Sequence, residues 1–533
     1  MPDFSFARIF SDGAVLQRKK EIHIWGFAKE GAKVNVSFAG TTRDTVSDDT
    51  GRFDAAFPAM EKGGPYDLTA SDDKGNKVQC SDIFIGDVII FSGQSNMEFP
   101  MIRVKETYPH EWDDPNDTMI RSFKVAENGV FSGPLRDVET GEWRKVSKDS
   151  IDDMSAVAYF TAKHIRQAED VAVGIIDLTL GGVIIEAFMS REMLKGFPEA
   201  LAEADKFADD AYRLKVISDN EKNAAKWLSD LDEGDIGLKE HFEDGEKILK
   251  EGRNLALPDF FSDTELSGFV GSVWIARRFT VPKKYVGKSA MLWFGAITDL
   301  DWCYVNGKFV GATDYSYPPR RYEIPEGLIH EGDNTVVFRI GVEKGFGRVT
   351  PGKLYGIVFG EGVRTTDGFI EGIDGADHIE GLGGVWKYII GNACEPSKDQ
   401  IFVNWKPTAL YNGLLAPLAG LSVKAFAYYQ GESNCGKYRE YEKLMHRFAD
   451  GIRKMWGHIP FIYVILPEFN TRMEEISFDH GEGWRGLTAA QEECASIEDA
   501  YPVRAYGCGE LNDIHPQRKE PIGKDIAHIL MRI

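Results

Sequence analysis

The sequence lacks any run of about 18 to 20 apolar residues, the length that a membrane-spanning helix needs. Residues 1–6 also lack the basic segment followed by an apolar one that marks a secretory signal. The six cysteines among 533 residues are scattered without paired spacing, which is typical of reduced thiols. These absences predict a cytoplasmic protein with no membrane partner, or a periplasmic or secreted one if a leader has been trimmed from the chain.

Positive charge is also scarce, because 62 Lys and Arg stand against 84 Asp and Glu and give a net charge of −22. Binding to nucleic acid or to an anionic membrane needs clustered Lys and Arg, and none are seen. The sequence therefore predicts no nucleic-acid partner. The motifs His-Glu-x-x-His, Cys-x-x-Cys and Gly-x-x-x-x-Gly-Lys-Ser/Thr are absent, so no metal or nucleotide cofactor is predicted.

A serine follows an apolar strand in the first fifth of the chain. The run Asp87–Ser92 gives way to Gly93-Gln94-Ser95-Asn96-Met97. A hydroxyl at the carboxyl end of a parallel strand, just before a helix, gains exposure, a favourable dipole and nearby N–H donors. The pattern predicts the nucleophile of an acyl-transfer enzyme. The alternative is an ordinary turn that caps a helix through Ser95 or Asn96.

A histidine near the end of the chain stands two residues after a carboxylate, in the segment Asn512–Pro516. A serine hydroxyl is a poor nucleophile until a base takes its proton, and the base works best when a carboxylate orients it. Ser95, His515 and Asp513 are therefore the predicted catalytic residues. As one of eleven histidines, His515 can alternatively cap or line a surface loop.

A third segment, Ala425–Asn434, again runs an apolar strand into a polar turn. Side-chain amides and glycine N–H groups in such turns are suitable donors to an oxyanion, each worth roughly 3 kcal/mol. The alternative is a turn without any catalytic role. The predicted oxyanion or substrate-binding residues of the two turns are Gln94, Gln430, Gly431, Glu432 and Asn434.

These segments occur in one order with Gly181-Gly182 and the run Pro407–Pro417. In that order and over most of its length, the chain resembles the sialate O-acetylesterase family of SGNH-type hydrolases, which also includes acetyl-xylan esterases. The early segments Leu16–Gly26 and Gly63–Leu68 are similar to the β-sandwich that precedes the esterase domain in this family.

The resemblance implies that Ser95 is the nucleophile and that His515 is the general base and then the acid, with Asp513 as the orienting carboxylate. Many relatives have Gly-Asp where this chain has Gly509-Glu510, so Glu510 is the alternative carboxylate. A Ser–His pair without a third member is the other alternative. The oxyanion donors that the resemblance implies are the backbone N–H groups of Ser95 and Gly182 and the turn of Gln430, Gly431 and Asn434.

The length of the chain exceeds what one hydrophobic core usually serves, so an α/β fold with several domains is predicted. Helices are expected at Val157–Ala168 and Gly523–Met531, and strands at Val88–Phe91 and Val171–Ile176. The predicted domains are an N-terminal β-sandwich (1–84), the first part of an SGNH-hydrolase-like three-layer parallel-sheet domain with a helical segment at 191–253 (85–253), an inserted jelly-roll, galactose-binding-like β domain (254–399), and the second part of the discontinuous hydrolase domain (400–533).

The sequence thus predicts a serine esterase that hydrolyses O-acetyl esters on carbohydrates through an acetyl-Ser95 intermediate. The resemblance names O-acetylated sialic acid as the substrate, with acetylated xylan or another polysaccharide as the alternative. A catalytically silent carbohydrate-binding protein and an enzyme that transfers acetyl groups to a sugar are the remaining hypotheses. No oligomeric state is predicted.

Overall fold

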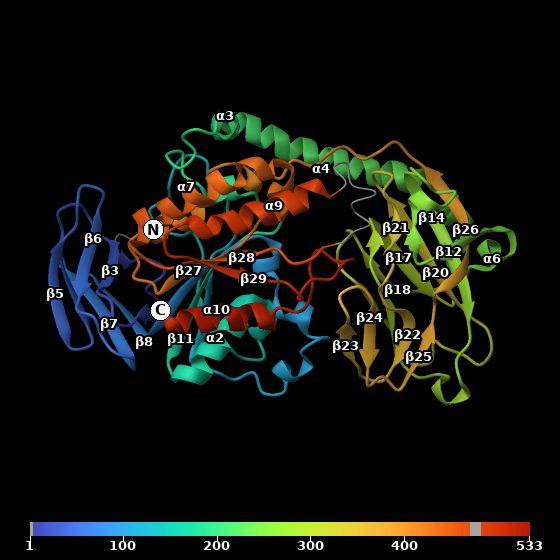
Figure 1. The fold of residues 1–533 in the computed structure, drawn as a ribbon, viewed down its shortest axis with the longest axis horizontal. Helices are drawn as coiled ribbons and strands as arrows, with labels where there is room; N and C mark the ends of the chain where they lie inside the picture. The colour runs from blue at the N-terminus through green and yellow to red at the C-terminus, as the bar shows by residue number, and fades with distance from the viewer. Residues whose placement is uncertain (1–3, 470–480) are drawn as a thin grey trace. The chain divides into compact units, whose positions relative to one another are not determined.

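A computed structural model describes residues 4–469 and 481–533 (Figure 1). The chain divides into two compact units. The first holds the chain up to Arg213 with Phe402–Gly509 and His515–Ile533, and the second holds Leu214–Ile401 with Glu510–Ile514. Each unit is therefore built from separate stretches of sequence.

A largely parallel sheet forms the centre of the first unit, in the order β10-β9-β11-β8-β27-β28-β29. Every neighbouring pair is parallel except β9 with the edge strand β10. The expected strand Val88–Phe91 is confirmed as part of β8, and the one expected at Val171–Ile176 is confirmed as β11, which begins one residue later. The strands are β8 (Lys77–Gly93), β9 (Ile120–Lys124), β10 (Trp143–Lys145), β11 (Ala172–Thr179), β27 (Ala425–Tyr429), β28 (Phe461–Ile465) and β29 (Ala500–Arg504).

Helices cover both faces of this sheet. Residues Val88–Phe91 of β8 are each at most 1% exposed, and a strand that is apolar on both faces requires cover on both. Figure 1 shows α2 and α10 on one side of the sheet and α7 and α9 on the other. The helices are α2 (Ala156–Glu169), α7 (Tyr438–Trp456), α9 (Glu482–Glu493) and α10 (Glu520–Arg532), so the expected helices at Val157–Ala168 and Gly523–Met531 are confirmed.

The pair α2 and α10 is packed closely. Ser155 caps α2 by accepting a hydrogen bond from the Ala158 N–H at 3.2 Å. On α10, a Cβ added to Gly523 would lie 2.7 Å from the Phe160 Cβ and 2.9 Å from the Thr161 nitrogen. The glycine therefore permits the contact that seats α10, the helix that follows His515.

The N-terminal region shares a strand with the central sheet. β1 (Ser5–Phe6), β3 (Ile22–Phe27) and β6 (Arg52–Phe57) form a separate sheet, while β4 (Lys33–Phe38), β5 (Thr41–Val46) and β7 (Gly63–Asp72) join β8. β7 pairs with β8 up to Ile85, and β11 pairs with it from Gly86 onward. The boundary predicted after residue 84 thus lies inside the single strand β8. One long strand and two consecutive strands have the same sequence pattern, so the sequence did not reveal that the strand continues.

The second unit contains antiparallel β-structure. A six-stranded sheet runs β12-β26-β14-β20-β17-β18, and a four-stranded sheet runs β19-β15-β22-β25. Their apolar side chains, including Phe294, Phe338 and Trp386, form one buried cluster. The strands are β12 (Arg253–Leu257), β14 (Gly271–Phe279), β15 (Ala290–Phe294), β17 (Leu300–Val305), β18 (Lys308–Thr313), β19 (Arg320–Ile324), β20 (Asn334–Val342), β22 (Tyr355–Phe359), β25 (His378–Gly381) and β26 (Gly384–Ala393). A small sheet of β13 (Asp259–Phe260), β21 (Arg348–Val349) and β16 (Ile297–Thr298) and a pair of β23 (Val363–Thr366) and β24 (Glu371–Asp374) complete the β-structure of this unit.

The helical segment predicted at 191–253 is divided between the units. It forms α3 (Pro198–Ala208), α4 (Asp210–Glu233), α5 (Ile236–Glu240) and α6 (Glu246–Glu251). Residues from Leu214 onward belong to the second unit, in contrast to the predicted boundary at 253, because Trp227 and Leu231 of α4 pack on Leu300 there. Within the described part of the chain, no helix combines the length and the apolar character that crossing a membrane requires.

Replacing Gly93 by alanine should lower the free energy of unfolding by about 2 to 3 kcal/mol. Its φ is 133°, and an added Cβ would lie 2.1 Å from the carbonyl oxygen of Tyr429. Urea unfolding measures the change. The matched control is Gly436→Ala, where nothing lies within 4 Å of the added Cβ. Equal stabilities of the two variants would contradict this account of the β8 terminus.

Candidate active site

Ser95 stands on a tight turn at the carboxyl end of β8. The backbone of Gly93 touches β27 so closely that a Cβ has no room beside the Tyr429 carbonyl. The Gln94 N–H donates to that same carbonyl oxygen at 3.0 Å. The four-residue helix α1 (Ser95–Glu98) begins immediately afterwards. Ser95 is therefore the first helical residue at the end of a central parallel strand, as the sequence pattern indicates.

The residues predicted as nucleophile and base lie together. His515 Nε2 is 2.8 Å from Ser95 Oγ, although the two residues are 420 positions apart in the chain. The imidazole stacks on the ring of Phe99, with centroids 6.0 Å apart and planes inclined by 16°. This contact allows the imidazole to accept the serine proton, which is the step that activates a hydroxyl nucleophile.

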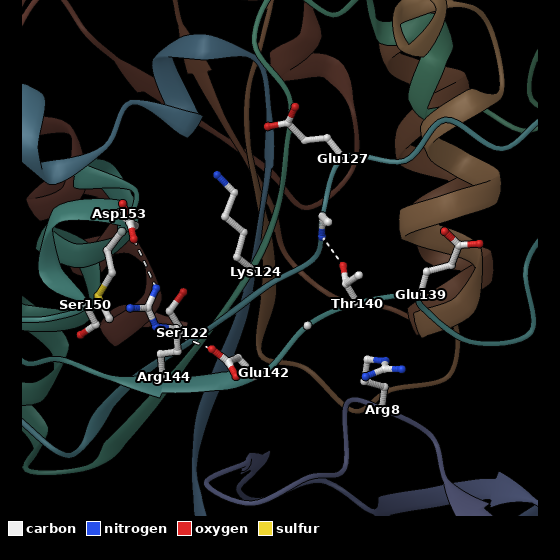
Figure 2. Close-up of a pocket in the computed structure, with 13 residues that line it drawn as sticks. Arg8, Ser122, Lys124, Glu127, Glu139, Thr140, Glu142, Arg144, Ser150 and Asp153 are labelled. Atoms are coloured by element: carbon white, nitrogen blue, oxygen red, sulfur yellow. Dashed lines mark hydrogen bonds and ion pairs between the residues drawn. The ribbon is translucent and has the colours of Figure 1, made fainter. Parts of the chain in front are cut away.

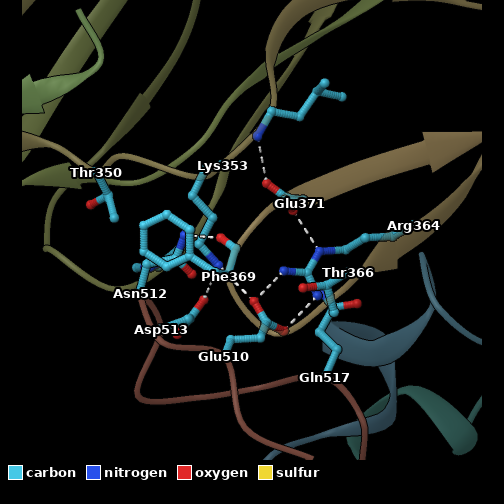
Figure 3. Close-up of polar contacts among 12 residues, drawn as sticks. Thr350, Lys353, Arg364, Thr366, Phe369, Glu371, Glu510, Asn512, Asp513 and Gln517 are labelled. Carbon is cyan, nitrogen blue, oxygen red and sulfur yellow. Dashed lines mark hydrogen bonds and ion pairs between the residues drawn. The ribbon is translucent and has the colours of Figure 1, made fainter. Parts of the chain in front are cut away.

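The two candidate carboxylates, Asp513 and Glu510, both contact Lys353 within the second unit (Figure 3). Lys353 Nζ lies 2.9 Å from Asp513 Oδ2 and 2.8 Å from Glu510 Oε2. Arg364 binds both oxygens of Glu510, at 2.9 and 2.6 Å. Burial would raise the pKa of Glu510, but Lys353 and Arg364 hold it well below its usual range. Because these cations occupy both Glu510 oxygens, Asp513 stays the predicted orienting carboxylate.

The turn Gly181-Gly182 adjoins Ser95. A Cβ added to Gly181 would lie 3.8 Å from the Ser95 Cβ, and one added to Gly182 would overlap the Trp405 ring at 2.1 Å. Gly182 also has a φ of 72°. Among the described residues, the N–H groups of Ser95 and Gly182 donate to no protein acceptor. These two N–H groups are therefore not engaged by the described part of the protein.

The predicted donor Gly431 is already used by the protein. Gln94 Oε1 accepts hydrogen bonds from the backbone N–H groups of Gly431 and Ser433, each at 3.2 Å. Ser433 Oγ in turn donates to the carbonyl oxygen of Gly182 at 2.7 Å. Gln94 and Gly431 thus join the turns after β8 and β27, and the prediction that the Gly431 N–H serves an oxyanion does not fit these contacts.

The predicted donor Gln430 is likewise occupied. Its Nε2 donates to the Val183 carbonyl at 3.1 Å and to Asn434 Oδ1 at 2.7 Å. Its Oε1 accepts from the Tyr441 hydroxyl at 2.8 Å. Both amide hydrogens and the amide oxygen are therefore engaged inside the protein, so these contacts do not favour the predicted role of Gln430 as an oxyanion donor.

Asn434 completes this amide framework. Its Nδ2 donates to Glu186 Oε2 at 2.9 Å, and its Oδ1 accepts from the Ile185 N–H at 3.0 Å. The side chain is 2% exposed. Asn434 therefore holds the segment after β11 against the turn after β27, and it does not fit the predicted role of an oxyanion donor. Glu186 was not selected as a site residue from the sequence, because its buried partner lies 248 residues away.

Glu432 accepts a hydrogen bond from Asn96, which is in turn bound by Lys519, and sequence reasoning selected neither of these partners. Asn96 Nδ2 donates to Glu432 Oε1 at 2.6 Å, and Lys519 Nζ donates to Asn96 Oδ1 at 2.5 Å. The other oxygen, Glu432 Oε2, is buried without a hydrogen-bond partner among the described residues. Burial raises the pKa of Glu432 above its ordinary value. Asn96 was detectable, because it follows Ser95 directly, whereas nothing in the sequence marks Lys519.

Three carboxyl groups and one ammonium group gather beside the glycine turn. Lys124 Nζ lies 3.4 Å from Glu98 Oε1, and Asp177 stands opposite Lys124 in the β11–β9 pairing. A Cβ added to Gly181 would lie 3.1 Å from Glu98 Oε2. Burial and a hydrogen bond to Glu98 raise the pKa of Glu127 to about 8.

Lys124 and Glu127 also line a cavity of about 630 Å³ (Figure 2). Hydroxyl groups and arginines contribute to the same lining, among them Ser122, Thr140 and Arg144. Such a volume lies in the range of small-molecule sites. In residues 4–469 and 481–533, no group of three or more His, Cys, Asp or Glu side chains is placed to hold a metal ion.

Comparison with known proteins finds relatives of one name. The sialate O-acetylesterase of Mus musculus is 25% identical over 209 residues, which cover 36% of this chain and 38% of that protein. The chain is similar to the sialate O-acetylesterases. The family member of Homo sapiens is 26% identical over 211 residues, covering 36% of this chain and 40% of that protein. The matched part therefore spans about two fifths of the length of these curated relatives.

Two further similarities concern the architecture. A carbohydrate acetylesterase from Xanthomonas citri shares the fold, with a TM-score of 0.56 and 19% identity over 98% of this chain and 74% of that one. Residues 206–345 match the family described as "Glycosyl hydrolases family 2, sugar binding domain". The family resemblance read from the motifs is confirmed, and a multidomain fold rich in sheets is common to this chain and its structural neighbour.

Replacing Gln430 by alanine should lower the free energy of unfolding by roughly 3 kcal/mol, since the change removes three buried hydrogen bonds, with the Val183 carbonyl, Asn434 Oδ1 and the Tyr441 hydroxyl. Urea unfolding tests this, with the exposed Gln79→Ala as a control that should stay within about 0.5 kcal/mol of the unmodified protein. An unchanged stability combined with lost activity would instead favour the oxyanion role.

The raised pKa of Glu127 predicts a pH dependence of stability. The folded protein holds this proton more tightly than the unfolded chain, so the contribution of Glu127 to the free energy of unfolding is lost as the pH rises between about 4.5 and about 8. Urea unfolding at pH 6 and pH 9 should show a smaller decrease for Glu127→Gln than for the unmodified protein. Identical decreases would count against the shifted carboxyl group.

Proposed function

We propose that the chain is a serine esterase that hydrolyses O-acetyl esters on carbohydrates, with Ser95 as nucleophile and His515 as general base. The observation that carries the proposal is the contact of 2.8 Å between Ser95 Oγ and His515 Nε2 at the carboxyl end of a central parallel strand. Ligands of open α/β sheets bind outside these strand ends. The names of the family members, which are acetylesterases, support the same class of reaction.

The reaction proceeds in two halves. His515 takes the hydroxyl proton while Ser95 Oγ attacks the acetyl carbonyl carbon, and the carbonyl oxygen becomes an oxyanion. The N–H groups of Ser95 and Gly182 donate to that oxyanion, at roughly 3 kcal/mol each. Protonated His515 then gives its proton to the departing sugar oxygen, which leaves acetyl-Ser95. Water activated by His515 releases acetate and restores the hydroxyl group.

The proposed catalytic fold is an SGNH-hydrolase-like domain of three layers, interrupted by a jelly-roll domain of the galactose-binding type. The parallel sheet with helices on both faces supports the first assignment. The antiparallel sheets of the second unit and the sugar-binding family match over residues 206–345 support the second.

O-Acetylated sialic acid is the proposed substrate, because sialate is the substrate named for the mammalian family members. Acetylated xylan and other acetylated polysaccharides are the competing substrates of the same chemistry. The sugar-binding family match favours one function of another class, which is sugar binding without hydrolysis. That function predicts retention on a sugar column and no acetate release.

The decisive experiment measures acetate released from acetylated sialic acid, acetylated xylo-oligosaccharides and a simple acetyl ester. Ser95→Ala and His515→Gln should each lower kcat at least about 1,000-fold. His446→Gln, a change in a partly exposed histidine of α7, should leave kcat unaltered. The ratio of kcat/KM values identifies the preferred sugar. Equal rates for the unmodified protein and Ser95→Ala would refute the serine mechanism.

A further inference from the structure

The segment Glu510–Ile514, immediately before His515, belongs to the second unit. His515 itself belongs to the first unit, where it contacts Ser95. His515, the base of the proposed reaction, is therefore joined by one peptide bond to a segment that belongs to the other unit. Contacts inside the second unit decide how firmly that segment is held.

Buried ion pairs hold the beginning of the segment (Figure 3). Lys353 Nζ binds Glu510 Oε2 at 2.8 Å, and Arg364 binds the same carboxylate with two nitrogens. The side chains of Lys353 and Glu510 are each 1% exposed, and that of Arg364 is 3% exposed. A buried carboxylate that loses such partners keeps an uncompensated charge, so Glu510 is tightly fixed.

The same ion pairs extend further into the second unit. Glu371 on β24 accepts from Arg364 Nε at 2.5 Å and from Arg321 Nη2 at 3.1 Å. Its other oxygen accepts the Leu354 N–H at 2.8 Å. Burial alone would raise the pKa of Glu371, but the arginines lower it to about 2. The network therefore stays charged at neutral pH, and it connects Glu510 through Arg364 to Glu371 on β24.

Hydrogen bonds of neutral groups fix the middle of the segment. The Leu511 N–H donates to the Gly368 carbonyl at 2.5 Å. Asn512 Nδ2 donates to the carbonyl oxygens of Pro351 and Phe369, at 2.7 and 2.9 Å. Lys353 then reaches Asp513 at 2.9 Å. The four residues from Glu510 to Asp513 are thus bound to the second unit. His515, the proposed base, follows two positions after Asp513.

We infer that the second unit positions His515, with Lys353, Arg364 and Glu510 as positioning residues for the reaction at Ser95. This inference rests on the proposed function and deepens it, since it gives the inserted β domain a part in catalysis. Nucleophile and base must keep hydrogen-bond distance for proton transfer, and a misplacement of about 1 Å can cost roughly 100-fold in rate. Releasing the segment therefore slows the chemistry and leaves sugar binding largely unchanged.

The test compares Glu510→Gln and Lys353→Met with the matched control Asp235→Asn. Asp235 forms an equally buried pair with Arg339 in the same unit, at 2.8 Å. Two rates are measured in the full chain: kcat with an acetyl ester, and covalent inactivation by a fluorophosphonate, which reports activation of Ser95 by His515. The two positioning variants should lose about 10- to 100-fold in both rates, with KM within about threefold.

The control variant should lose stability and keep both rates within about threefold. If the charge variants do not fold, Asn512→Ala removes two hydrogen bonds without burying a charge, and it should lower both rates severalfold. Rates of every folded positioning variant equal to those of the control would overturn the inference. Normal fluorophosphonate labelling of Ser95 without acetate release would count against the esterase proposal alone, because the labelling rate still reports the position of His515.

Discussion

The site depends on the level at which three parallel strands end. Gly93 of β8 stands opposite Thr179 of β11 on one side and opposite Tyr429 of β27 on the other. The turns that follow these strands therefore emerge side by side, and the serine, the glycine turn and the amide-rich turn become neighbours. The close approach of Gly93 to Tyr429 requires a residue without a side chain. The register of β8 thus places Ser95 before any contact with His515 is made.

Amide side chains then join the turns into one framework. Gln94 connects the turn after β8 to the turn after β27, and Gln430 and Asn434 connect the latter to the segment after β11. Each amide satisfies buried backbone groups that water cannot reach. The side-chain amides that the sequence suggested as oxyanion donors are engaged in these hydrogen bonds. The backbone N–H groups of Ser95 and Gly182, in contrast, have no protein acceptor among the described residues. Rigid support of a reacting pair by satisfied polar groups is a general requirement for accurate positioning.

The two candidate carboxylates, Glu510 and Asp513, are likewise bound by other side chains of the protein. Glu510 is enclosed by Lys353 and Arg364, so its charge is neutralised before it can serve His515. Asp513 shares the same lysine. A buried group of alternating charges is stable only when every member is present. The second unit therefore also binds the segment Glu510–Ile514 that leads to His515.

The amino-acid sequence by itself determined the strand before Ser95, the helices α2 and α10, the resemblance to the sialate O-acetylesterases, and the choice of Ser95 and His515, which the fold brings together. These features depend on residue patterns within a few positions, or on motifs in a fixed order. Only the tertiary structure decided which polar groups remain available, because the partners of Gln430 and Asn434 lie 247 and 248 residues away. It also decided the boundaries at 84 and 253, since a continuous strand and a helix that packs on a remote sheet carry no local signal. Hydrogen-bond satisfaction and burial are properties of the assembled chain, and local sequence cannot specify them.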